Sequence, residues 1–93
     1  PNPVAGTPHA KGIILAVNPD GSSESGIWSC TQGERTLTFA NDEFCYFLGG
    51  KGAYIHDSGE EIPVHAGAIV FFPKGWSGRS VITETLSKAF MSR

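Results

Sequence analysis

Glycine and proline are spread so evenly through this chain that they argue against long helices. The 93 residues include 12 Gly and 6 Pro, and no stretch between them keeps apolar residues at the 3.6-residue period of a helix face. What remains is a series of short β-rich runs: Lys11–Val17, Gly26–Thr31, Glu34–Phe39, Glu43–Gly49, Gly52–His56, Glu61–His65, Ala68–Phe72, Gly78–Thr83 and Leu86–Ser92. Many short strands at close spacing predict an all-β, antiparallel sandwich or barrel.

The segments between these runs have the residues of tight turns. Asp57 to Glu60 reads as a hairpin turn in which Gly59 takes a positive φ. Pro73 and Gly75 close the apolar run before them, because proline is excluded from a central strand. We expect one domain over residues 1–93, with residues 1–10 as an extended N-terminal arm.

The composition limits which binding partners and which cellular compartment we expect for this protein. A net charge of −2 and a pI near 5.8 provide no basic surface for nucleic acid or for an anionic membrane. No apolar run reaches the ~20 residues of a spanning helix, and no signal-peptide pattern is visible. Cys30 and Cys45 lie in different runs, and we read them as reduced thiols. We therefore expect a cytoplasmic protein with no nucleic-acid or membrane partner.

The segment from Glu43 to Gly50 (EFCYFLGG) resembles the first signature of the cupin β-barrels. That signature is a His-x-His pair, followed by a Glu and, after six more residues, a Gly. Glu43 and Gly50 match its second half. The His-x-His positions fall on Leu37 and Phe39, or on Thr36 and Thr38, so the histidines are missing.

The segment from Gly67 to Gly78 (GAIVFFPKGWSG) resembles the second cupin signature. Gly67, Pro73 and Gly75 match in place, and Gly78 occupies the histidine position. With GIW at residues 26–28 and DEFCY at residues 42–46, the chain is similar to small cupins of the (S)-ureidoglycine aminohydrolase and ethanolamine-utilisation types. The resemblance implies a single cupin domain with an antiparallel jelly-roll barrel.

The residues available do not predict a metal site or another cofactor. Of the cupin ligand set only Glu43 is present, and a zinc, manganese or iron site needs three or more ligands. Pairing across the turn at residues 57–60 would put His56 opposite Glu61 and His65 near Gly52. At ~3.3 Å per residue those two histidines are too far apart to share an ion.

Glu43 is the candidate catalytic residue. Strand alternation places Glu43, Cys45 and Phe47 on one face, which the cupin resemblance directs into the barrel. A carboxylate buried there needs a partner, and we propose Lys88 or a cationic group of a ligand. The alternative is that Glu43 lies at a wet barrel mouth while Lys88 extends to solvent.

Aromatic residues and Gly78 complete the candidate ligand-binding set. Trp76 and Gly78 share a face, so Gly78 would leave space for a ligand and Trp76 would provide a flat wall. Trp28 has the same possible role, but for either tryptophan simple core packing is the alternative. Cys45 beside a carboxylate is a packed thiol, because a nucleophilic cysteine needs a neighbouring cation or helix N-terminus.

Three functions remain open on the sequence alone. In the first, the barrel binds a small polar metabolite and turns it over without metal, with Glu43 as acid or base. In the second, the domain is a non-catalytic binding or assembly module whose barrel is filled by Phe47 and Trp76. In the third, the chain is a fragment of a larger enzyme.

The outward row of Phe44, Tyr46 and Leu48 predicts a homodimer.

Overall fold

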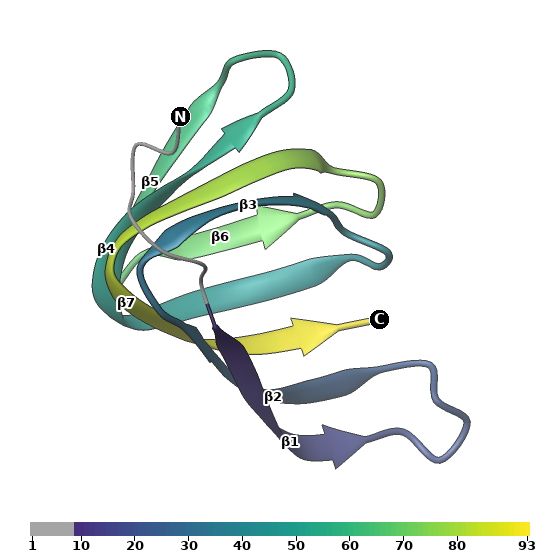
Figure 1. The fold of residues 1–93 in the computed structure, drawn as a ribbon. Helices are drawn as coiled ribbons and strands as arrows, with labels where there is room; N and C mark the ends of the chain where they lie inside the picture. The colour runs from purple at the N-terminus through teal and green to yellow at the C-terminus, as the bar shows by residue number, and fades with distance from the viewer. Residues whose placement is uncertain (1–8) are drawn as a thin grey trace.

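The computed structural model describes residues 9–93, which form seven strands and no helix. The strands are β1 (Ala10–Val17), β2 (Glu24–Cys30), β3 (Gly33–Thr38), β4 (Glu43–His56), β5 (Glu61–His65), β6 (Ile69–Phe72) and β7 (Ser77–Ser92). Every pairing is antiparallel, which confirms the predicted all-β class. Figure 1 shows the strands curving around a common interior, with the β1–β2 and β4–β5 hairpins projecting to either side.

Two long strands hold the barrel together. Along β7, residues 77–82 pair with β3 and residues 86–92 pair with β2. Along β4, residues 43–46 pair with β6 and residues 51–55 pair with β5. Since β4 and β7 also pair with each other over most of their length, each long strand belongs to both layers of the sandwich.

The expected breaks in these two strands are absent. The runs 43–49 and 52–56 are one strand, as are the runs 78–83 and 86–92. Register shifts between Phe47 and Gly52 absorb the bend, so β4 curves without a turn. A β-bulge bends and twists a strand while pairing continues on both sides of it, and this is why the glycines here do not end β4.

Alternation along β4 agrees with the prediction. Cys45 and Phe47 are buried, whereas Phe44, Tyr46 and Leu48 are exposed on the outer face. The apolar core fills the interior between the layers, and its buried members are Cys30, Cys45, Phe47, Tyr54, Val64, Phe72, Ile82 and Leu86.

The turns and the termini also follow the local sequence. Gly59 has a φ of 100° in the β4–β5 turn, as predicted. Gly75 has a φ of 89° in the turn that separates β6 from β7, where the end of the apolar run was expected. Most of the expected arm, residues 1–8, lies outside the described residues, and Ala10 already belongs to β1. Within residues 9–93 the structure has no helix that could cross a membrane.

The two cysteines are both free and buried, as expected for reduced thiols. Cys30 pairs with Leu86 of β7, whereas Cys45 pairs with Phe90. Four residues along one strand correspond to ~13 Å, which is beyond the reach of a disulfide.

Candidate functional site

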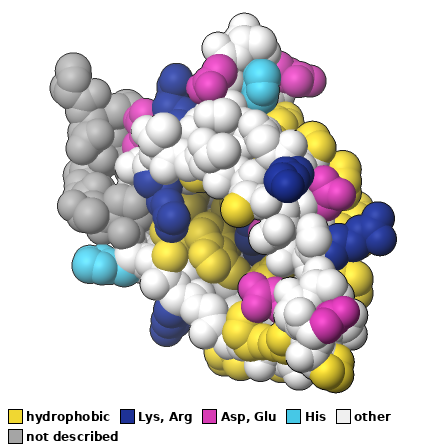
Figure 2. Space-filling view, turned by 90° about the vertical axis from the view of Figure 1, so that its right-hand side faces the viewer, with side chains coloured by type: hydrophobic (Ala, Val, Ile, Leu, Met, Phe, Trp, Pro, Cys, Tyr) yellow, Lys and Arg dark blue, Asp and Glu magenta, His cyan; other side chains and the backbone are white. Residues whose placement is uncertain are grey.

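A cavity of 310 Å³ opens at the end of the barrel that faces right in Figure 1. Figure 2 looks onto this end and shows a hollow floored by hydrophobic side chains, with charged side chains around its rim. Trp28, Leu37, Phe39 and Tyr54 form much of the wall. The cavity volume is at the lower end of the range for small-molecule sites.

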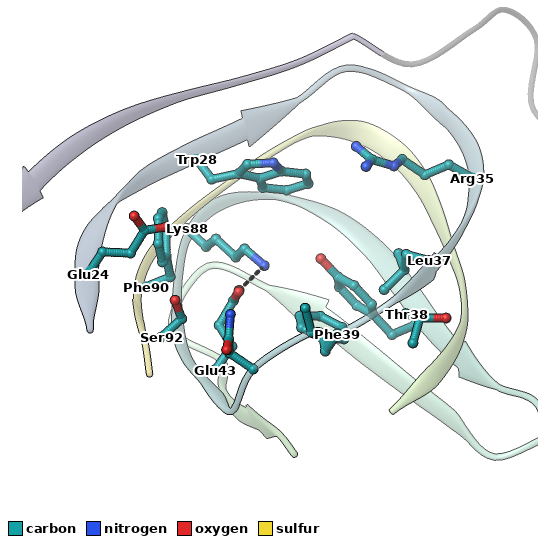
Figure 3. Close-up of a pocket in the computed structure, with 13 residues that line it drawn as sticks. Glu24, Trp28, Arg35, Leu37, Thr38, Phe39, Glu43, Lys88, Phe90 and Ser92 are labelled. Atoms are coloured by element: carbon teal, nitrogen blue, oxygen red, sulfur yellow. Dashed lines mark hydrogen bonds and ion pairs between the residues drawn. The ribbon is translucent and has the colours of Figure 1, made fainter. Parts of the chain in front are cut away.

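A buried ion pair lies in this cavity. Lys88 Nζ is 2.7 Å from Glu43 Oε2, and the two side chains are 6% and 17% exposed. Glu43 Oε2 also accepts a hydrogen bond from Cys45 Sγ at 3.2 Å. Both members of the pair line the cavity, where Figure 3 shows them pointing toward each other. Of the two arrangements expected for Glu43, the structure has the one in which Lys88 is its partner.

The strand register explains why the ammonium group of Lys88 lies among aromatic rings. On β7, Lys88 is directly paired with Trp28 of β2 on one side and with Phe47 of β4 on the other. Its Nζ lies 4.7 Å from the centroid of the Trp28 ring and 5.9 Å from that of Phe47. Three further rings, those of Phe39, Tyr54 and Phe72, have centroids within 6.0 Å of Nζ. Such contacts stabilise a cation electrostatically.

These surroundings keep Lys88 charged. Burial by itself lowers the pKa of Lys88, but the Tyr54, Cys45 and Glu43 groups around it outweigh burial, and the net shift is upward. At neutral pH the tyrosine and the cysteine are protonated, so the Glu43 carboxylate is the acting partner. Lys88 is therefore a charged hydrogen-bond donor in the cavity, and not an amine nucleophile.

Cys45 is an inert thiol at neutral pH. Burial raises its pKa to about 12; the Lys88 ammonium opposes that rise, and Glu43 adds to it. The thiol is fully buried, keeps its proton and donates a hydrogen bond to the Glu43 carboxylate. This agrees with the prediction of a packed thiol, because only the thiolate is nucleophilic.

Three of the residues selected from the sequence meet around the cavity, and two others lie next to them. Glu43, Lys88 and Trp28 line the cavity. Cys45 and Phe47 are fully buried neighbours of the ion pair and do not reach the open space. Their predicted part in ligand binding is therefore confined to supporting Glu43 and Lys88.

The expected roles of Gly78 and Trp76 were wrong. A Cβ at Gly78 would strike the Ile55 carbonyl oxygen, so this glycine lets β4 and β7 approach each other, and it does not line the cavity beside Glu43. Trp76 packs edge-on against Phe72, with ring centroids 5.0 Å apart, and is not part of the cavity wall. The core-packing alternative holds for Trp76.

Sequence reasoning missed part of the wall. Arg35, Leu37 and Phe39 line the cavity, and Phe39 stacks on Phe72 with ring centroids 4.4 Å apart. The signal was present, since Leu37 and Phe39 were one of the two alternatives for the cupin His-x-His positions. Tyr54 was missed because its run was expected to be a separate short strand, whereas it continues β4 back into the interior.

The family model described as the EutQ-like cupin domain matches residues 17–90. The chain belongs to the EutQ-like cupin family. A search of curated proteins finds no match.

Solved structures agree with the family. The chain aligns with a putative ethanolamine utilization protein Q from Salmonella typhimurium at 24% identity and a TM-score of 0.78, covering 89% of this chain and 68% of that one. The EutQ protein of Clostridium difficile aligns at 19% identity and a TM-score of 0.77, covering 89% of this chain and 66% of that one. A DUF861-family protein of Thermotoga maritima aligns at 30% identity and a TM-score of 0.67, covering 69% of this chain and 73% of that one. The chain thus spans about two thirds of the EutQ proteins, and these likenesses support the cupin fold.

The residues of this EutQ-like cupin do not fit the metal of the wider cupin fold. The positions of the cupin histidines hold Leu37, Phe39 and Gly78, none of which has a ligating side chain, and Glu43 is already paired with Lys88. Within residues 9–93, no three His, Cys, Asp or Glu side chains gather as a metal site would need.

The histidines of the β4–β5 hairpin are likewise separated, although the predicted register was wrong by one residue. Glu61 pairs with Ile55 and His65 with Lys51. The one-residue difference arises because the backbone bond from His56 N to Glu60 O already closes the turn. His56 and the partner of His65 are then five residues apart on β4, or ~16 Å.

Proposed function

We propose that this cupin domain binds a small polar metabolite in the barrel cavity, and that Glu43 transfers a proton to or from it without a metal ion. The observation that carries the proposal is the buried Lys88–Glu43 pair bordering an open cavity. Replacing a buried ion pair with apolar residues is often neutral or stabilising, so such a pair is weak evidence for a structural role. Its position beside ligand-sized space supports a role in binding.

The two charged groups have different parts in this proposal. Lys88 holds its proton and donates hydrogen bonds to an electron-rich atom of the ligand, because its pKa is raised. Glu43 is the group that accepts a proton, since its carboxylate borders the cavity and is held in place by Lys88 and Cys45. Trp28 and Phe39 offer planar apolar surfaces for the rest of the molecule.

Native mass spectrometry tests this function. We would treat the protein with EDTA, mix it with pools of small polar metabolites and compare it with Glu43→Gln. We expect at least one small-molecule adduct on the protein with the unmodified sequence. Glu43→Gln should lose this adduct while its circular dichroism spectrum stays the same as that of the unmodified protein. The proposal fails if no pool gives an adduct, or if Glu43→Gln unfolds the protein and thereby shows Glu43 to be structural.

A second candidate is an assembly module, which the outer surface of the sheet favours. Two cross-strand rows of exposed apolar side chains, which we call the outer apolar face, cross β6, β4, β7, β2 and β1; their members are Ile13, Ile27, Phe44, Tyr46, Ile69, Phe71 and Met91. No member is charged, so the face is suited to a second copy of itself. We therefore propose a homodimer that buries the outer apolar face about a two-fold axis.

We also propose that the protein works in the cytoplasm. The two buried free cysteines support this, because thiols stay reduced in that compartment. Expression of a tagged full-length chain followed by fractionation checks it, and recovery in a secreted fraction would contradict it.

A further inference from the structure

The ion pair leaves a hydrogen-bond acceptor free on the cavity floor. Glu43 Oε2 accepts from both Lys88 Nζ and Cys45 Sγ. Among residues 9–93, no hydrogen bond reaches the other oxygen, Oε1. Because a carboxylate has about four lone-pair positions, Oε1 can accept from a ligand without disturbing the pair.

The same pair leaves a hydrogen-bond donor free beside that acceptor. Lys88 has three N–H donors, and one of them is used by Glu43 Oε2. No hydrogen bond to a second side chain is formed by Nζ within the described part of the chain, although the Tyr54 ring lies beside it with its centroid 5.8 Å away. The two remaining N–H groups are therefore free to donate to a ligand, because the Lys88 side chain, although only 5% exposed, lines the cavity.

Charge then limits which ligand group suits this floor. A carboxylate could accept from Lys88, but it would put a second anion next to Glu43. An ammonium group could donate to Glu43, but it would put a second cation next to Lys88. Either arrangement is penalised by like-charge repulsion, which is strong where water is excluded.

Resting on the function proposed above, we infer that the group recognised by Lys88 and Glu43 is neutral and planar, with an acceptor next to a donor, as in a carboxamide. Its carbonyl oxygen accepts from Lys88 Nζ, and its N–H donates to Glu43 Oε1. Figure 3 shows Trp28 and Phe39 on opposite sides of the space in front of the pair, so a flat group attached to the amide lies between two aromatic surfaces.

Three compounds with the same ring test this inference, namely benzamide, benzoate and benzylammonium. We would measure their affinities for the full chain at pH 7 by isothermal titration calorimetry. Benzamide is expected to bind about tenfold more tightly than either ion. A hydrogen bond to a charged group of the ion pair contributes about this factor to the affinity, and each of the two ions loses that contribution to like-charge repulsion.

Single-residue variants change the expected order in a defined way. Glu43→Gln leaves the positive charge of Lys88 without its partner, so the affinity for benzoate relative to benzamide should rise by about tenfold. Lys88→Met leaves the negative charge of Glu43 without its partner, so the affinity for benzylammonium relative to benzamide should rise by a similar factor. Lys74→Gln is the matched control, because it removes one positive charge at an exposed position that does not line the cavity; benzamide is expected to remain the tightest ligand.

The outcomes separate this inference from the function on which it rests. If benzoate or benzylammonium binds the unmodified chain most tightly, the cavity is a ligand site but the amide preference is wrong. If none of the three compounds binds at millimolar concentration, the inference is overturned, and the adduct experiment with metabolite pools then decides the proposed function by itself. The comparison on the unmodified chain decides this even if Lys88→Met does not fold.

Discussion

At the scale of single residues, Lys88 is the side chain that organises the site. The need of a buried carboxylate for a partner made Lys88 a candidate from the sequence, but an extended, solvent-facing Lys88 was the alternative, and the pair with Glu43 became definite only in the structure. The error at Gly78 has a different cause. Whether a glycine leaves open space or allows two backbones to approach depends on the neighbouring strand, and local sequence does not contain that information.

The pair is expected to behave as a unit in stability measurements. Lys88→Met should lower the free energy of unfolding by about 3 kcal/mol, the low end of the range for a broken buried pair, because Glu43 retains some solvent contact. Adding Glu43→Gln should recover most of that loss, since no uncompensated charge remains. Urea denaturation of the two variants checks this, and equal losses in both would contradict the paired description.

Cys45 provides a pH-dependent prediction. An exposed thiol has a pKa of about 8.5, so its folded value of about 12 means that the unfolded state releases this proton first as pH rises. The resulting stabilisation is complete below pH ~8.5 and is lost progressively toward pH 12. We expect folded protein to resist a thiol reagent at pH 8 and to react at once in guanidinium. Immediate reaction of one thiol in the folded protein would disprove this.

At the scale of elements, the turns were predictable and the continuity of the long strands was not. The turn at Gly59 is determined by residues within it, so the sequence alone is sufficient there. The bends in β4 and β7 depend on pairing between residues far apart in the chain. The glycines at 49, 50 and 52 look like the end of a strand, but they lie where β4 curves past β7.

Glycine-to-alanine substitutions test this description of the long strands. Gly78→Ala should cost about 2–3 kcal/mol, because its Cβ would strike the Ile55 carbonyl and force β4 away from β7. Gly49→Ala is the matched control, since the nearest atom to its Cβ is Ser87 Oγ at 3.7 Å; we expect no loss or a small gain. Thermal unfolding compares them, and equal effects would contradict the close approach at Gly78.

At the scale of the whole molecule, a thin core and a large exposed apolar surface go together. A chain of 93 residues buries a smaller fraction of its surface than a larger domain does, and a second copy would supply what it lacks. The outward row on β4 was enough to predict where that surface lies, whereas its extension across β6, β7 and β2 needed the register.

The homodimer can be tested by charge insertion. Light scattering after size exclusion should give twice the 9.9 kDa of one chain for the unmodified protein and a single chain mass for Phe44→Glu. Thr36→Glu, an exposed position on β3 and outside the outer apolar face, should remain dimeric. A monomeric unmodified protein would rule out the proposed interface.

The central claim is that the cavity at the Lys88–Glu43 pair receives a small molecule, and the two tryptophans allow the most direct test of it. Trp28 lines the cavity, whereas Trp76 is half-buried, packs against the core and does not line the cavity. In a ¹⁵N-labelled sample titrated with benzamide, we expect the indole cross-peak of Trp28 to move in a saturable way while that of Trp76 stays in place. Two stationary peaks, or movement of Trp76 alone, would contradict the account.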